Sequence, residues 1–174
     1  MQYENVMQEP RIGKVTLNIG VGESGEKLVK AETLLQKITN KKPVRTNSKH
    51  KLPSWNLRKG EPIGCKVTLR GKDAEEVLKR MFYARDNKLD DSNFDKLGNL
   101  SFGIHEYIDI QGLKYDPDIG IFGLNVTATI EKPGYRIKRR KLKKTKPSKK
   151  QTLTKQEAID FIKEKFGVEI EKEE

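Results

Sequence analysis

Three segments of the chain alternate between apolar and polar residues. In residues 63–70, isoleucine, cysteine, valine and leucine stand at the odd positions, and glycine, lysine, threonine and arginine stand at the even positions. Residues 14–19 and 124–131 repeat the pattern. Because side chains of a strand point alternately to opposite faces, each segment is predicted to be a strand with one buried face and one exposed polar face.

Helical spacing replaces the alternation in three other segments. Leu28, Ala31, Leu35 and Ile38 form one apolar stripe in residues 26–41.

Two more helices have start signals. Asp73 is followed three residues later by Glu76, and Thr154 is followed by Glu157, the spacing of a capping box. The last helix is expected over residues 154–166 and closes the chain.

The order of these elements predicts the fold class. Further strands are expected at 44–48 and 100–108, so the chain reads strand, helix, two strands, helix, two strands, basic arm, helix. This order favours an α+β fold, with a mainly antiparallel sheet that carries helices on one face and leaves the other face open for RNA. We expect residues 1–174 to form a single RNA-binding domain.

The positive charge of the chain is concentrated in one segment. The net charge is +11, yet residues 136–150 hold ten basic residues and no acidic one, and the rest of the chain holds 26 basic and 25 acidic residues. Such a block is typical of a solvated arm or a nucleic-acid-binding arm, and we favour the second. Its principal candidates are Arg136, Lys138, Arg139, Arg140, Lys141, Lys143 and Lys144.

Several classes of function are disfavoured. Cys65 is the one cysteine and is expected in the core. It has no metal-ligand spacing to the two histidines, His50 and His105, which are 55 residues apart. No catalytic residue, metal or cofactor is predicted. The N-terminus lacks the features of a signal peptide and the longest near-apolar run, 119–124, is too short for a membrane span, so a cytoplasmic protein without a membrane partner is expected.

One motif supports an alternative. Gly20, Gly22 and Gly25 match the spacing of a dinucleotide-binding loop between a strand and a helix, which would suit a nucleotide-binding enzyme. However, the segment that should supply the ribose-binding acid contains no carboxylate, and the later strands alternate where a parallel sheet would be continuously apolar. Glycines that let the backbone turn tightly are the simpler interpretation.

Aromatic residues near the fifth strand do not form a base-stacking sheet. Tyr107 is five positions after Phe102, an odd spacing, so a regular strand would put the two on opposite faces, one buried and one peripheral.

A second basic segment lies between two predicted strands. Residues 49–60 are predicted to form a mobile cationic loop with an aromatic residue near its tip, suited to RNA contact and stacking. Its candidate residues are Lys49, His50, Lys51, Trp55, Arg58 and Lys59, with Arg45 nearby.

Longer motifs in the chain resemble a known family. The likeness lies in five stretches: Thr-Leu-Asn-Ile-Gly-Val-Gly-Glu at 16–23, Lys-Pro-Val-Arg-Thr at 42–46, Arg-Lys-Gly-Glu-Pro-Ile-Gly-Cys-Lys-Val-Thr-Leu-Arg-Gly at 58–71, Gly-Asn-Leu-Ser-Phe-Gly-Ile-His-Glu at 98–106 and Tyr-Asp-Pro-Asp-Ile-Gly-Ile-Phe-Gly at 115–123. The chain resembles the universal large-subunit ribosomal protein number five family in its archaeal form.

This resemblance implies a structural role in translation, without catalysis. The polar sheet face would bind 5S rRNA and help attach it to the large-subunit rRNA in the central protuberance, through the residues that match the family motifs, Asn18, Thr46, Lys66, Thr68 and Arg70. The 49–60 loop would reach peptidyl-site tRNA, and another surface would form an intersubunit bridge with small-subunit ribosomal protein thirteen. The arm at 136–150 matches no family pattern.

Overall fold

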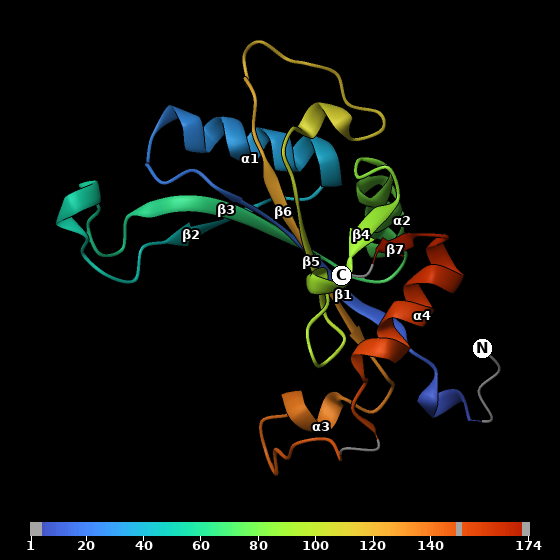
Figure 1. Ribbon diagram of the computed structural model, residues 1–174. Helices are drawn as coiled ribbons and strands as arrows, with labels where there is room; N and C mark the ends of the chain where they lie inside the picture. The colour runs from blue at the N-terminus through green and yellow to red at the C-terminus, as the bar shows by residue number, and fades with distance from the viewer. Residues whose placement is uncertain (1–4, 149–150, 172–174) are drawn as a thin grey trace.

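A five-stranded antiparallel sheet forms the centre of the computed structural model, which describes residues 5–148 and 151–171. Its strands lie in the order β2-β3-β1-β6-β5 (Figure 1). The elements are β1 Arg11–Gly20, α1 Glu26–Thr39, β2 Val44–Asn47, β3 Pro62–Leu69, α2 Lys72–Tyr83, β4 Lys88–Asp90, β5 Leu100–Ile104, β6 Leu124–Glu131, α3 Arg136–Arg139, α4 Lys155–Phe166 and β7 Glu169–Glu171.

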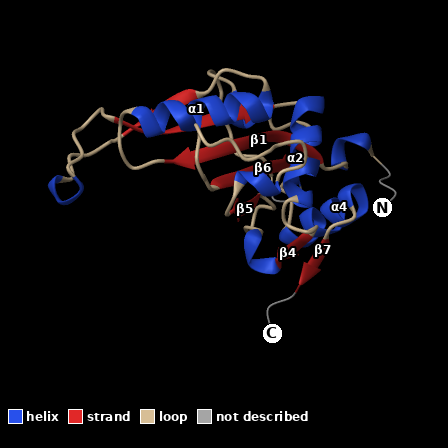
Figure 2. Cartoon of the chain, turned by 90° about the horizontal axis from the view of Figure 1, so that it is seen from above, coloured by secondary structure: helices blue, strands red, loops and turns tan. Residues whose placement is uncertain are grey.

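Helices α1, α2 and α4 pack on one face of this sheet, as Figure 2 shows for α1. The stripe Leu28, Ala31, Leu35 and Ile38 is buried, and it shares one hydrophobic core with the apolar residues of the strands, including Cys65. The predicted α+β class, with a mainly antiparallel sheet, is therefore confirmed. Because the apolar positions of the strands are buried on this face, their polar positions lie on the opposite face.

Helix starts follow the sequence signals in one case and depart from them in another. Thr154 caps α4 as predicted, because its hydroxyl accepts the Glu157 N–H while the Glu157 carboxylate accepts the Thr154 N–H. The capping box predicted at Asp73 is wrong. The N-cap of helix α2 is Gly71, with φ of 65°, two residues before Asp73, and Asp73 forms an ion pair with Lys41 instead.

The strand predicted at 100–108 is shorter than expected. β5 ends at Ile104, and Tyr107 begins a 3-10 turn whose backbone is tied to Phe122 by a 3.1 Å hydrogen bond. Since strand alternation stops at Ile104, Tyr107 is buried together with Phe102, and the expectation of one peripheral aromatic is wrong. The Tyr107 hydroxyl accepts the N–H of Asp116 at 2.9 Å, which satisfies its buried polar atom.

The prediction that a helix closes the chain is wrong for the described residues, because a short strand follows α4. After α4, strand β7 pairs in parallel with β4, which lies in the segment 87–98 that lacks a periodic pattern. Both strands are three residues long, too short for alternation to mark them.

Candidate nucleic-acid interface

The polar side chains of β1, β3, β5 and β6 lie in rows across the open face of the sheet. Lys66 is opposite Asn18, which is opposite Asn125. Because directly paired residues of an antiparallel sheet point to the same side, each row joins groups from several strands. A second row runs Thr68, Thr16, Thr127 and Ser101.

Four of the five predicted sheet residues therefore meet on one surface of β1 and β3. Asn18, Lys66 and Thr68 belong to the two rows, and Arg70 follows β3 with its guanidinium 3.5 Å from the carbonyl oxygen of Gly13. Lys66, Thr68 and Arg70 are exposed. These groups offer hydroxyl, amide and cationic hydrogen-bond donors, which suit phosphate and ribose oxygens.

The fifth predicted residue, Thr46, lies on the neighbouring strand β2. It is opposite Gly64, which places its side chain on the same face. A side chain at position 64 would lie 3.0 Å from the Thr46 hydroxyl, so the absence of a side chain there leaves room for Thr46 to lie over the sheet.

The open face contains more polar residues than the five that match the family motifs. Thr16, Asn125 and Thr127 share it and were not singled out, although the alternation that predicted their strands already put them on the polar side. At the β5 edge the face deepens into an open hollow of about 460 Å³. It is lined in part by Asn99, Ser101 and Thr129.

At the end of β6 the alternation fails to predict exposure. Glu131 belongs to the polar set but its side chain is only 7% exposed, because the Arg139 guanidinium forms an ion pair with it. The Glu131 carboxylate also lies over Gly13, where a Cβ atom would come within 2.7 Å of it. This acidic group on the open face is thus covered by a residue of the basic arm.

The predicted 49–60 loop forms the end of a hairpin that projects from the sheet (Figure 1). The hairpin continues past β2 and β3 through hydrogen bonds between Ser48 and Glu61 at 2.8 Å and between Gly60 and Ser48 at 2.9 Å. Leu52 and Leu57 bridge nearer the tip, where residues 53–55 make a 3-10 turn. The expected mobile loop thus has a hydrogen-bonded backbone along its length.

The candidate residues of the hairpin face outward. Lys49, His50, Lys51, Arg58 and Lys59 are exposed, and Trp55 at the tip is 71% exposed, so its ring does not fold back on the core.

Two charges at the base of the hairpin are taken up by other elements. Arg45 pairs with Glu32 of α1, whose hydrogen bond raises the pKa of Arg45. The Glu61 carboxylate accepts the Arg58 N–H at 2.9 Å and the Ser24 hydroxyl at 2.8 Å, and both bonds lower the pKa of Glu61. The Glu61 carboxylate therefore stays ionised, and its bond to Ser24 holds the base of the hairpin to the loop after β1.

The basic arm is described as far as Ser148, and Lys149 and Lys150 lie outside the described residues. It begins with the short helix α3 and continues without regular structure. The predicted residues Arg136, Lys138, Arg139, Arg140, Lys141, Lys143 and Lys144 are all exposed.

The glycine motif does not form a dinucleotide site. Both neighbours of β1, β3 and β6, are antiparallel to it, whereas a dinucleotide-binding loop needs a parallel sheet. The N–H groups of Val21 and Gly22 donate to the carbonyl of Ile63 at 3.0 and 2.9 Å, so they are already paired. Gly22, with φ of 82°, serves the tight turn from β1 to α1.

Neither a metal-binding cluster nor a membrane-spanning helix is found in the described residues. Among the described residues, no cluster of three histidine, cysteine or acidic side chains is placed to hold a metal ion. No helix within residues 5–148 and 151–171 has the length and apolar content needed to cross a membrane.

The sequence matches two family models. Residues 5–58 match the family described as ribosomal protein L5, and residues 62–161 match the model for the C-terminus of this ribosomal family. Proteins named large ribosomal subunit protein uL5 are similar over nearly their whole length. The protein from Methanosphaera stadtmanae is 53% identical over 96% of this chain and 99% of its own. The proteins from Methanococcus aeolicus and Sulfurisphaera tokodaii are 51% and 49% identical, over 96% and 97% of this chain and 94% and 96% of their own.

These matches define the class as a structural protein of the large ribosomal subunit, not an enzyme. More particularly, the chain belongs to the ribosomal protein L5 family, and its relatives here are archaeal. RNA binding and a location in the cytoplasmic ribosome follow from this membership. The alternative of a nucleotide-binding enzyme is wrong, because the sheet is antiparallel at the glycine motif and the family is ribosomal.

Proposed function

We propose that the open face of the sheet binds 5S rRNA and helps attach it to the large-subunit rRNA in the central protuberance. The observation that carries this proposal is the row of Lys66, Asn18 and Asn125, which lies exposed or half-exposed on the same face as Arg70. Structured RNA is recognised mainly by shape, through phosphate and 2′-hydroxyl contacts. A flat surface of amides, hydroxyls and two cations supplies the donors for such contacts without requiring access to paired bases.

The hairpin serves a second partner in this proposal, peptidyl-site tRNA. Its support is the projection of residues 49–60 beyond the sheet and the outward position of four cationic side chains with Trp55. Cationic groups contact a nucleic-acid backbone, and an aromatic ring can stack on an exposed base or ribose. An intersubunit bridge to small-subunit protein thirteen is the third part, supported by the family resemblance.

We propose further that residues 1–174 act as a single RNA-binding domain. One hydrophobic core draws on strands β1, β3, β5 and β6 and on helices α1, α2 and α4. Shared burial of this kind makes the elements fold together, so the open face and the basic segments keep one geometry.

The test is recovery of the bound RNA. The tagged chain is purified from native cells after ribosomes are dissociated into smaller particles, and the RNA is extracted and hybridised with a 5S rRNA probe. The purified chain is also titrated with a 5S rRNA transcript and with a duplex RNA of equal length. The proposal expects 5S rRNA in the particle and tighter binding of the transcript than of the duplex. Equal affinity for the two RNAs would overturn it.

A further inference from the structure

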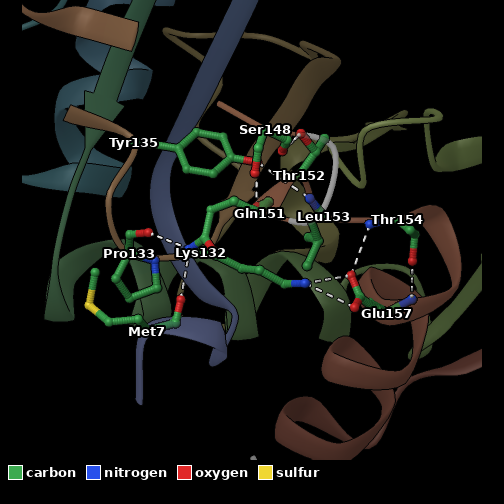
Figure 3. A network of polar contacts seen from close by, with 10 residues as sticks. All are labelled: Met7, Lys132, Pro133, Tyr135, Ser148, Gln151, Thr152, Leu153, Thr154 and Glu157. Atoms are coloured by element: carbon green, nitrogen blue, oxygen red, sulfur yellow. Dashed lines mark hydrogen bonds and ion pairs between the residues drawn. The ribbon is translucent and has the colours of Figure 1, made fainter. Parts of the chain in front are cut away.

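The basic arm leaves the fold and returns to it at one place. Tyr135 precedes the arm and Gln151 follows it, and the Tyr135 hydroxyl lies 3.4 Å from the Gln151 carbonyl oxygen, to which it donates (Figure 3). The same hydroxyl accepts the N–H of Leu153 at 3.4 Å. We call Tyr135 and Gln151 the latch.

The latch also joins the arm to the start of the chain. The Gln151 side-chain amide donates to the carbonyl oxygens of Met7 at 2.8 Å and Pro133 at 2.9 Å, as Figure 3 shows. The residue before Pro133 makes a further contact, because the Lys132 ammonium donates to both carboxylate oxygens of Glu157. Three segments far apart in sequence are therefore fastened at the base of the arm.

Within residues 136–148 the chain is further constrained. The N–H of Thr145 donates to the carbonyl of Ile137 at 3.3 Å, and the Arg140 guanidinium donates to the carbonyl of Lys143 at 2.9 Å. Lys143 adopts a left-handed conformation with φ of 49°, which reverses the chain. Residues 136–148 thus carry internal hydrogen bonds, and they differ from the solvated tail that the composition of the arm allows.

This arrangement concentrates like charge. Residues 136–148 contain basic residues and no acidic one, so their side chains repel one another when the loop is closed. A tether made of a phenol and an amide is uncharged, and its strength does not depend on the counterions that phosphate binding displaces. The latch can therefore hold the cations together both before and after RNA binds.

The arm is also joined to the open face. Arg139 covers Glu131, which lies on that face over Gly13, and the Gly13 carbonyl oxygen is 3.5 Å from the Arg70 guanidinium. The cations of the arm thus begin where the cations of the sheet end.

We propose that residues 136–148 are a preorganised phosphate-binding loop that extends the open face, and that the latch positions this loop on the phosphate backbone of the RNA held by the sheet. This inference rests on the proposed function of the open face. Preorganisation matters because ordering a flexible cationic segment at the moment of binding would consume part of the binding free energy. Tyr135 and Gln151 act here as positioning residues, which need not touch RNA.

The test removes the latch without removing charge. Gln151→Ala and Tyr135→Phe are titrated with a 5S rRNA transcript over a range of salt concentrations, beside wild type and the control Gln156→Ala, whose amide lies on the exposed side of α4 near Asp160. Both latch variants are expected to bind roughly three- to tenfold more weakly. The dependence of log affinity on log salt should also become shallower, because fewer phosphates are contacted at once. The control should match wild type.

A charge variant completes the design. Replacing Lys138, Lys141 and Lys143 with glutamine should reduce the salt slope by about 2.1 to 2.7, at roughly 0.7 to 0.9 per phosphate contact. Thermal unfolding of every variant identifies losses that come from a smaller folded fraction. Latch variants with the affinity and slope of wild type, or with losses no larger than their unfolded fraction, would overturn this inference alone. A wild-type chain that does not prefer the transcript would overturn the proposed function as well.

Discussion

The Lys132 ammonium donates two hydrogen bonds, each 2.9 Å long, to the two carboxylate oxygens of Glu157. The Lys132 side chain is only 6% exposed, so this cation has little access to water. Glu157 also accepts the Thr154 N–H at 3.0 Å, so one carboxylate both completes the capping box of α4 and pairs with a lysine that follows β6. The pair fastens the last helix to the central sheet.

Glu157→Gln should destabilise the fold by about 2 kcal/mol, because it leaves a buried ammonium without its anionic partner. Chemical denaturation gives the free energy of unfolding. The control is Glu23→Gln, which removes an exposed partner of Lys27 and should cost no more than about 0.5 kcal/mol. Equal changes in the two variants would contradict the buried pair.

The contribution of Glu157 should depend on pH in one direction. Burial alone would raise the pKa of Glu157, but hydrogen bonds from the Thr154 backbone and Lys132 outweigh it, so the pKa lies below the ordinary 4.5. A lowered folded pKa gives stability that is complete above the unfolded pKa and is lost as pH falls through the folded value. The difference in unfolding free energy between wild type and Glu157→Gln should therefore be constant near neutrality and shrink below about pH 4.5. A constant difference down to strongly acid pH would contradict it.

Cys65 should be unreactive in the folded protein. Burial, with a smaller effect of the Glu32 charge, raises the pKa of its thiol to about 11. Since the thiolate is the reactive species, only about one thiol in a thousand is ionised at about pH 8, and the side chain is inaccessible. Ellman's reagent should react slowly with the native chain and rapidly in guanidinium chloride. Equally fast reaction in both conditions would show that Cys65 is accessible.

Gly64→Ala should destabilise the sheet by about 1–3 kcal/mol through overpacking. A Cβ at this position would lie 2.8 Å from the backbone oxygen of Ile19, which cannot move without disturbing β1. Gly103→Ala is the matched control on β5, because its Cβ would meet the Asn125 side-chain oxygen at an ordinary 3.5 Å. Denaturant midpoints that shift equally would argue against the close approach of β3 and β1.

Lys66→Ala and Arg70→Ala should weaken 5S rRNA binding while leaving stability within about 0.5 kcal/mol of wild type, because both side chains are exposed. Each variant should reduce the salt slope by about 1, as expected for one phosphate contact. Lys163→Ala removes a charge from an exposed position of α4 and serves as control. Unchanged affinity in salt-controlled titrations would reject the open face as the RNA site.

The hairpin should affect a different partner. Replacing Lys51 and Lys59 with glutamine and Trp55 with alanine is expected to spare 5S rRNA binding, since these residues project beyond the sheet. Ribosomes reconstituted with the variant should retain peptidyl-site tRNA less well in a filter-binding assay, with a larger effect at low salt. Equal loss of both activities would mean that the hairpin belongs to the rRNA site.

Local pattern predicted the parts of the fold where one physical requirement dominates. The alternation around Lys66 identified a half-buried strand because only one face of the sheet is covered, and Thr154 with Glu157 identified a helix start because the two residues satisfy each other's backbone. It was wrong for Phe102 and Tyr107, since nothing in the sequence shows that β5 ends at Ile104. Alternation predicts which side chains are buried only within a strand, and tertiary contacts determine where the strand ends.

The sequence by itself determined the longer helices and strands, the polar face and the basic segments, because burial periodicity and charge are local properties of the chain. Only the tertiary structure decided which groups meet. It placed Asn18 beside Lys66 through strand register, buried Glu131 beneath Arg139, and joined Tyr135 to Gln151 at the base of the arm. Such pairs come from segments brought together when the core forms, and no local pattern encodes their contact.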